Sequence, residues 1–135
     1  MTVPVSRIDL FGSLLHLDPS GRMHVEEPTA NTELERDGWL FMAAHVATDD
    51  DVQGDHWEIH TEADEFVACL TGGIRVILRP DRPEEDEEVI ALGPGAAVIV
   101  PRGRWHRLAL DAPGDMLAVT LPRGTREEKW TGAGG

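Results

Sequence analysis

Short apolar runs, each closed by glycine, proline or aspartate, recur along this chain and predict an all-β structure. The clearest runs cover residues 39–46, 66–70, 74–78, 89–92, 96–100, 108–110 and 116–121. Each is about as long as a β-strand, and none reaches helix length with a 3.6-residue apolar period. Many short strands separated by turn residues are typical of a β-sandwich or barrel, and neither an internal repeat nor an interdomain linker interrupts them.

Turn chemistry near the N-terminus predicts a hairpin ahead of the main strands. Residues 18–21 read Asp-Pro-Ser-Gly, in which proline presets one backbone dihedral angle and glycine permits a positive one. We expect the run 8–17 before this turn to pair with residues 22–25 after it. The polar stretch 26–38 that follows is expected to be a loop.

The C-terminal part, residues 122–135, is polar. We expect one helical turn at 125–130 and a disordered glycine-rich stub at the end. The prediction therefore has three parts: N-terminal strands and a loop that pack on the barrel (1–38), the barrel (39–121) and a polar tail (122–135).

Composition limits the classes of partner. The chain has 135 residues, with 41% apolar and 27% charged residues, which suits one globular domain with a real core. Its formal net charge of −13 argues against nucleic acids and anionic membranes, because both require a basic surface. We therefore expect a small-molecule partner, without nucleic acid or membrane.

Several other classes of site and location are disfavoured by the sequence. The single cysteine, Cys69, excludes an internal disulfide and a cysteine-based zinc site. No serine occupies a nucleophile elbow, and neither a dinucleotide fingerprint nor a phosphate-binding loop is present. No apolar run approaches the roughly 20 residues that span a bilayer, and no basic segment followed by a hydrophobic one opens the chain, so we expect a cytoplasmic protein.

Acidic residues and histidines gather at residues 57–65. If 57–60 is a strand, Glu58 and His60 lie on the same face. Glu65 opens the next apolar run, 66–70, which is expected to return antiparallel beside the first. Two carboxylates and an imidazole would then converge on one side of a small sheet, an arrangement typical of a metal site.

A second stretch supplies a partner for this cluster. Its spacing is Gly95, five residues, Pro101, one residue, Gly103, two residues and His106. A strand would follow Gly95 and a turn would occupy 101–104. His106 would then enter the next strand near its beginning, where its side chain can point back into a barrel mouth.

Taken together, the two stretches resemble the two motifs of the cupins, small double-stranded β-helix barrels of the jelly-roll type. The first cupin motif has two histidines flanking one residue, a glutamate four or five positions later and a glycine after six more. The matching positions here are Glu58, His60, Glu65 and Gly72, followed by Gly95, Pro101, Gly103 and His106 of the second motif. The usual closing asparagine of that motif falls on Leu110, and the resemblance spans about residues 39–121.

The resemblance implies one divalent transition metal held by His60, Glu65 and His106, with Glu58 in place of the family's first histidine. Iron, manganese, nickel and zinc all accept a shell of two imidazoles and two carboxylates, so the metal stays open. His56 is the alternative to Glu58, because positions 56, 58 and 60 share a face. Counting back from Gly72 selects Glu65 over Asp64 as the glutamate of the motif.

The function that the resemblance implies is that of a metal-dependent cupin-type enzyme acting on a small oxygenated organic molecule. The leading hypothesis is oxygenase chemistry, that is, an oxidoreductase and in particular a dioxygenase. Glu58 or Glu65 would act as its base. A non-catalytic small-ligand-binding or sensing cupin is the first alternative, and an isomerase or epimerase is the second. The resemblance also implies a homodimer paired through the N-terminal strands at residues 8–25.

The roles of three further side chains stay open in the sequence. Trp39 and His45 lie in one apolar run and can contribute to a pocket wall. Arg75 can bind a substrate carboxylate or enolate, although an outward-facing arginine in a salt bridge is the commoner arrangement.

Overall fold

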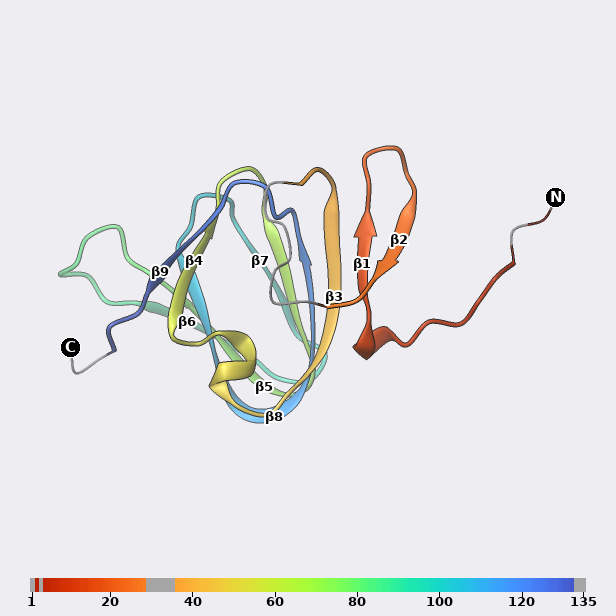
Figure 1. The fold of residues 1–135 in the computed structure, drawn as a ribbon. Helices are drawn as coiled ribbons and strands as arrows, with labels where there is room; N and C mark the ends of the chain where they lie inside the picture. Colours follow the sequence, from red (N-terminus) through yellow and green to blue (C-terminus); the bar gives the residue numbers. More distant parts are fainter. Residues whose placement is uncertain (1, 3, 29–35, 133–135) are drawn as a thin grey trace.

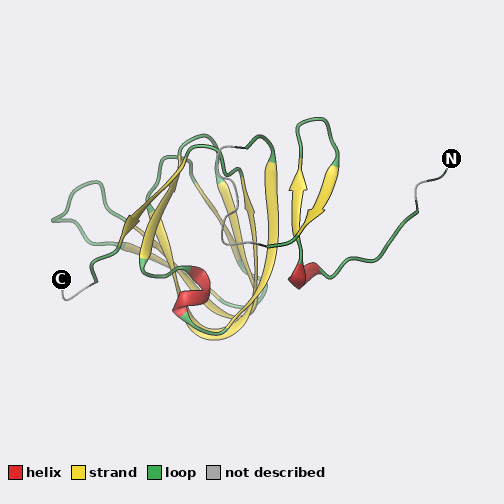
Figure 2. Ribbon diagram, in the orientation of Figure 1, coloured by secondary structure: helices red, strands yellow, loops and turns green. Residues whose placement is uncertain are grey.

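The protein is described by a computed structural model that covers residues 2, 4–28 and 36–132. Most of the predicted loop at 26–38 and the last three residues of the glycine-rich stub lie outside the described residues. Antiparallel strands curl into a barrel, and helical structure in the described part is confined to two short 3₁₀ turns (Figures 1 and 2). The predicted all-β, cupin-like jelly-roll fold with an N-terminal hairpin is confirmed.

Nine strands and two 3₁₀ helices are assigned within the described ranges. They are η1 (Leu10–Gly12), β1 (Leu14–Leu17), β2 (Met23–Glu26), β3 (Trp39–Val46), η2 (Asp49–Val52), β4 (His56–His60), β5 (Glu65–Leu78), β6 (Glu88–Leu92), β7 (Ala97–Val100), β8 (His106–Thr120) and β9 (Thr125–Lys129). The sheet runs β2-β1-β3-β8-β4-β9, and β5 pairs with β6, β7 and β8. The division at residues 38 and 121 stays a prediction, and the sheet runs across both boundaries. Neither of the helices in the described part is long and apolar enough to cross a membrane.

Two of the predicted strand breaks are bends inside longer strands. Residues 66–70 and 74–78 belong to β5, and residues 108–110 and 116–120 belong to β8. The β5–β8 pairing shifts register between Cys69 and Ile74, which marks a bulge. Gly72 sits there with φ of +81°, a conformation that favours glycine. Figure 1 shows both strands curving around the lower end of the barrel at this level.

The expected pairing of residues 57–60 with residues 66–70 is wrong. β4 pairs with β8 and β9, whereas the start of β5 pairs with β7. The connection at 61–64 carries the chain across the barrel mouth, where two hydrogen bonds from the 101–104 turn hold it. Gly103 N donates to His60 O (2.8 Å) and Arg102 N donates to Asp64 Oδ1 (3.0 Å). The two halves of the predicted motif are thus joined through their turns.

The helical turn expected at 125–130 is also wrong. This segment forms β9, which pairs with the whole of β4 so that Thr125 lies opposite His60. β4 contacts β8 through one side only, and the backbone groups on its other side need partners. The polar residues of β9 supply those partners at the edge of the sheet.

Two apolar clusters hold the barrel together. The inner cluster contains Val67, Cys69, Val76 and Met116, and Cys69 is fully buried, as a packed thiol should be. The second cluster, on the outer face of β4, β5 and β8, consists of Trp57, Ile77 and Ala109 with Trp105 and Trp130. Three of the four tryptophans therefore stabilise the outside of the barrel, away from its interior.

Candidate metal centre

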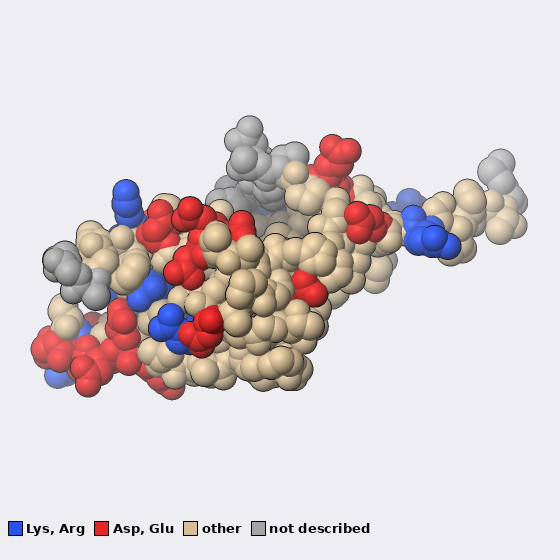
Figure 3. All heavy atoms as spheres, turned by 90° about the horizontal axis from the view of Figure 1, so that it is seen from below, with Lys and Arg blue, Asp and Glu red and all other residues tan. Residues whose placement is uncertain are grey.

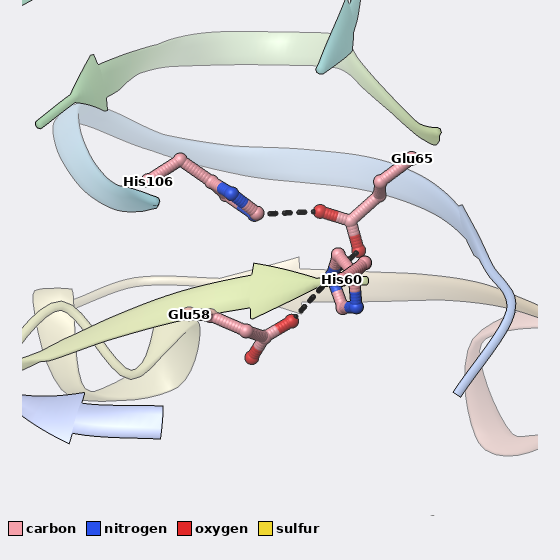
Figure 4. A group of neighbouring side chains, drawn as sticks. All are labelled: Glu58, His60, Glu65 and His106. Carbon is pink, nitrogen blue, oxygen red and sulfur yellow. Dashed lines mark hydrogen bonds and ion pairs between the residues drawn. The ribbon is translucent and has the colours of Figure 1, made fainter. Parts of the chain in front are cut away.

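Four side chains from three strands converge at one end of the barrel interior. Glu58 and His60 project from β4, Glu65 from the first position of β5 and His106 from the first position of β8 (Figure 4). One ligand atom of each lies within 4.8 Å of the others. His60, Glu65 and His106 are buried, with exposed fractions of 4%, 7% and 3%, and Glu58 is partly exposed.

Glu65 bridges the two histidines. Its Oε1 lies 3.0 Å from His106 Nε2, and its Oε2 lies 3.1 Å from His60 Nε2. On the opposite side, Glu58 Oε1 lies 2.7 Å from the same His60 nitrogen. Both imidazoles therefore present Nε2 to a carboxylate-lined centre, as the dashed lines in Figure 4 show.

Hydrogen bonds from outside the group fix the orientation of its members. His106 Nδ1 donates to Arg104 O (3.0 Å), and His60 Nδ1 is hydrogen-bonded to Thr125 Oγ1 (2.9 Å). The Thr120 hydroxyl donates to Glu65 Oε2 (2.6 Å). Because both Nδ1 atoms have partners, both Nε2 atoms are available to a metal, the arrangement typical of histidine ligands.

Sequence reasoning missed these two threonines. The sequence predicts a helical turn around Thr125, and only the pairing of β9 with β4 brings this residue to His60. Thr120 had a usable signal, because it alternates with Met116 and Ala118 on the inward face of β8.

The charges of the group are strongly coupled. Burial alone lowers the pKa of His60, but the carboxylates of Glu58 and Glu65 outweigh it and raise that pKa from 6.5 to about 10. For His106, burial is likewise outweighed, chiefly by Glu65, and the pKa rises. Burial alone raises the pKa of Glu65, yet His106 and His60 lower it from 4.5 to about 2. Without a metal, imidazolium groups thus balance the carboxylates.

The buried Nε2 atom of His60 lies between two carboxylate oxygens, 2.7 Å from Glu58 Oε1 and 3.1 Å from Glu65 Oε2. A single N–H can point well at only one of two acceptors, so a proton alone leaves this nitrogen and its neighbours imperfectly paired. Two imidazole nitrogens and two carboxylates form a donor set that suits divalent iron, manganese, nickel or zinc. The residues present therefore fit a metal.

The structure separates the alternatives that the sequence left open. His56 Nδ1 lies 2.8 Å from Asp55 Oδ1, and His56 is outside the four-residue group that Glu58 completes. Asp64 accepts a hydrogen bond from the backbone of Arg102, so Glu65 alone of the two enters the group.

The three open side chains all lie away from this centre. Arg75 forms a salt bridge with Asp111 (2.7 Å) on the outside, which confirms the outward-facing interpretation. His45 stacks on Phe11 and pairs with Asp115. Trp39 lines a separate hollow beside the N-terminal hairpin.

A cavity of about 320 Å³ opens onto the group. The group contributes Glu58, Glu65 and His106 to its lining. The other lining residues are Met42, Ala44, Asp51, Val52, Gln53, His56, Val67, Arg107, Leu108, Met116, Ala118 and Thr120. Apolar side chains thus line, together with the candidate ligands, a space large enough for a small organic molecule.

Comparison with known proteins gives structural neighbours alone. No family model and no curated protein matches the chain. A cupin-2 domain protein from Shewanella frigidimarina is 19% identical over 66% of this chain and 74% of its own, with a TM-score of 0.48. Hydroxypropylphosphonic acid epoxidase from S. wedmorenis is 19% identical over 62% and 42% of the two chains, with a TM-score of 0.44.

Oxalate decarboxylase from Bacillus subtilis is a third neighbour, 17% identical over 65% of this chain and 23% of its own, with a TM-score of 0.49. These values are too low to carry an argument about activity. The strand order, the two motifs and the inward convergence of their residues are the chain's own features. By these features the chain has a cupin-like fold with a possible metal site of Glu58, His60, Glu65 and His106.

Proposed function

We propose that this protein is a metal-dependent enzyme that acts on a small oxygenated organic molecule, with oxygenase chemistry as its class. The observation that carries the proposal is the four-residue ligand group on the wall of a cavity. The cavity volume of about 320 Å³ lies near the lower end of small-molecule sites, which run from roughly 300 to 1,000 Å³. A non-catalytic ligand-binding cupin and an isomerase remain the competing functions.

The ligand group would hold one divalent iron, manganese, nickel or zinc ion through His60, His106, Glu65 and Glu58. When bound, such a metal polarises substrate oxygens, raises the acidity of the substrate and, if redox-active, brings in dioxygen. Imidazole and carboxylate donors suit each of these metals, and the donor set leaves their identity to experiment.

The two carboxylates are held differently, which favours one of them for the proton-accepting role. Glu65 is fixed by His60, His106 and the Thr120 hydroxyl and is buried. Glu58 contacts His60 alone within the group and is 29% exposed. Glu58 is therefore the carboxylate that can turn toward a substrate and take its proton, whereas Glu65 keeps the histidines in place.

The remaining lining orients the substrate and limits water. Val67, Met116 and Ala118 belong to the packed core and present a rigid apolar surface beside the ligands. A substrate whose oxygen atoms face Glu58 and His106 would place its carbon body against this surface. Exclusion of water there strengthens the polar contacts at the other end of the molecule.

Metal content tests the proposal first. Protein purified without a histidine tag should contain close to one transition metal per chain, and His60→Ala/His106→Ala should lose it. If wild-type protein also binds none after incubation with iron, manganese, nickel and zinc, the proposal fails. Glu84→Gln, a change at an exposed loop position, is the control.

Oxygen consumption then separates the competing functions. With metal-loaded protein and a panel of diketones, catechols and flavonols, the proposal expects oxygen uptake that depends on both metal and substrate. Tight ligand binding without turnover would instead support a binding or sensing protein. Conversion of substrate without oxygen uptake would support an isomerase.

The proposed protein partner is a second copy of this chain. β2 lies at the edge of the sheet, and its Met23 and Val25 are 70% and 54% exposed. An edge strand has unpaired backbone groups that a second copy can pair. This homodimer is proposed on the position of the hairpin beside β3 (Figure 1).

A further inference from the structure

The charge of the candidate centre differs from the charge that its resemblance implies. Glu58 and Glu65 together balance the two positive charges of a divalent ion, so the occupied group is neutral. A histidine at position 58 would leave the same group with one positive charge. The exchange therefore removes the excess positive charge that would attract an anionic substrate to the metal.

The cavity does not restore that charge elsewhere. Among the residues that line it, Arg107 is the one arginine or lysine, and the imidazole of His56 is paired with Asp55 at 2.8 Å. Strand alternation places Arg107 on the face opposite His106. Its guanidinium lies 3.6 Å from the centre of the Trp130 ring and 3.9 Å from Glu87. The positive charge of Arg107 thus interacts with Trp130 and Glu87 on the outer face of β8.

Further carboxylates make the surroundings negative. Asp51 lines the cavity and accepts hydrogen bonds from the backbone N–H groups of Ala47 and Thr48. Glu127 of β9 lies opposite Glu58, so the two side chains share a face. Figure 3 shows that acidic side chains also gather at the left end of the molecule, where the β5–β6 loop projects in Figure 1. An anion would meet carboxylates inside the cavity, and the net charge of −13 would repel it on approach.

The apolar part of the cavity lining is suited to a carbon body. Seven of the lining residues are apolar: Met42, Ala44, Val52, Val67, Leu108, Met116 and Ala118. A carboxylate or phosphonate group placed there would lose its water without gaining a cation or a donor. An apolar body would instead be stabilised by its own burial.

From these observations we infer the substrate class of the site, an inference that rests on the proposed function. The substrate is an uncharged molecule with an apolar body and an oxygen-bearing end, such as an enol, a hydroxyketone or a catechol. Glu58 is the residue that selects it. A neutral substrate leaves the total charge of the site unchanged, whereas an anion adds a charge that no arginine or lysine in the lining is free to balance.

Matched probes test this selection. Acetylacetone and acetoacetate have nearly the same size, and the second carries a carboxylate in place of an acetyl group. Catechol and salicylate form a second pair. Calorimetric titration of metal-loaded protein under argon should give a dissociation constant at least roughly tenfold lower for the neutral member of each pair. Equal or tighter binding of the anionic members, or failure of both neutral probes to bind, would overturn the inference.

Two variants test the assigned cause. Glu58→Gln removes one negative charge with little change of shape, and it should reduce the preference for the neutral probes roughly tenfold, whereas Glu84→Gln should leave it unchanged. Met42→Lys leaves the ligand group intact and adds a cation to the wall, so it should shift the preference in the same direction. Val89→Lys, at an exposed position of β6 outside the cavity lining, is its control. An unchanged preference in both cavity variants would contradict the role of charge.

Measuring the metal content of every sample distinguishes a failure of the proposed function from a failure of the substrate class alone. If wild-type protein binds no metal, the proposed function fails and the substrate class fails with it. If metal is bound at close to one per chain but the anionic probes bind as well as the neutral ones, the substrate class alone is wrong.

Discussion

Glu58 of β4 and His106 of β8 lie directly opposite each other as the single residue pair that joins these two strands. This pair brings the first sequence motif against the second. Because Glu58 and His106 are backbone neighbours, the separation of their side chains depends little on the long connections between them. The Glu58–His106 side of the candidate centre is therefore held by strand pairing, which is more rigid than loop contacts.

Thr125 should control metal affinity through His60. Thr125→Val removes the hydrogen bond to His60 Nδ1 while keeping the shape of the side chain. Loss of such an orienting partner typically weakens metal binding by about 10–100-fold, and we expect a loss in this range. Competition titration with a chromogenic chelator measures it.

The control for this change is Thr131→Val at an exposed position after β9. It should leave metal affinity unchanged. Equal affinities for Thr125→Val and wild-type protein would show that Thr125 does not orient the ligand.

The stability of the metal-free protein should depend on pH at both ends of the range. The pKa of Glu65 falls from 4.5 to about 2, so its contribution is present above 4.5 and is lost as pH falls toward 2. The pKa of His60 rises from 6.5 to about 10, so its contribution is present below 6.5 and is lost as pH rises toward 10. Urea unfolding with a chelator present should show the largest contribution of this group between pH 4.5 and 6.5.

Glu65→Gln tests the acid side of this prediction. Removing one member of a buried ion pair typically costs about 3–5 kcal/mol, and the variant should be less stable than wild-type protein near pH 6 by about this amount. The difference should shrink as pH falls toward 2. A difference that stays constant over this range would assign the loss to packing.

The sequence predicts the residues of the candidate site more completely than it predicts which strands pair. Alternation on one strand placed Glu58 and His60 on the same face, and the spacing to Gly95 and His106 indicated the second half. The pairing of the strands is harder to predict, because an apolar run carries no information about which strand lies beside it. Residues 66–70 were assigned beside 57–60 by proximity in sequence, whereas the turn at 61–64 sends them to the other side of the barrel.

The C-terminal strand β9 is polar, so it lacks the apolar run by which the other strands can be predicted. β9 contains Thr, Arg, two Glu and Lys, and most of these side chains are exposed, so nothing in their pattern distinguishes a strand from a helical turn. Its conformation is set by the free edge of β4. The contact between Thr125 and His60 depends on that pairing and was for the same reason invisible in the sequence.

Gly72 should be required for the bend shared by β5 and β8. A Cβ atom at this position would collide with the backbone carbonyl oxygen of Pro113, and φ of +81° is strained for other residues. Gly72→Ala should therefore lower the free energy of unfolding by about 1–3 kcal/mol or more. Gly93→Ala is the matched control, because no atom lies within 4 Å of its added Cβ. Equal losses in the two variants, measured by urea unfolding, would argue against a special role of the bend.

The exposed edge strand β2 should mediate the proposed homodimer. Met23 and Val25 alternate with His24 and share a face of β2, and both are largely exposed. Met23→Lys/Val25→Lys would place two positive charges on each copy at the contact, so like charges would oppose pairing. Light scattering after gel filtration should give the mass of two chains for wild-type protein and of one chain for the variant. Val89→Lys/Ile99→Lys, at two exposed positions of β6 and β7, should stay dimeric. A wild-type mass of one chain would refute the dimer, and a variant that stays dimeric would place its interface on another face.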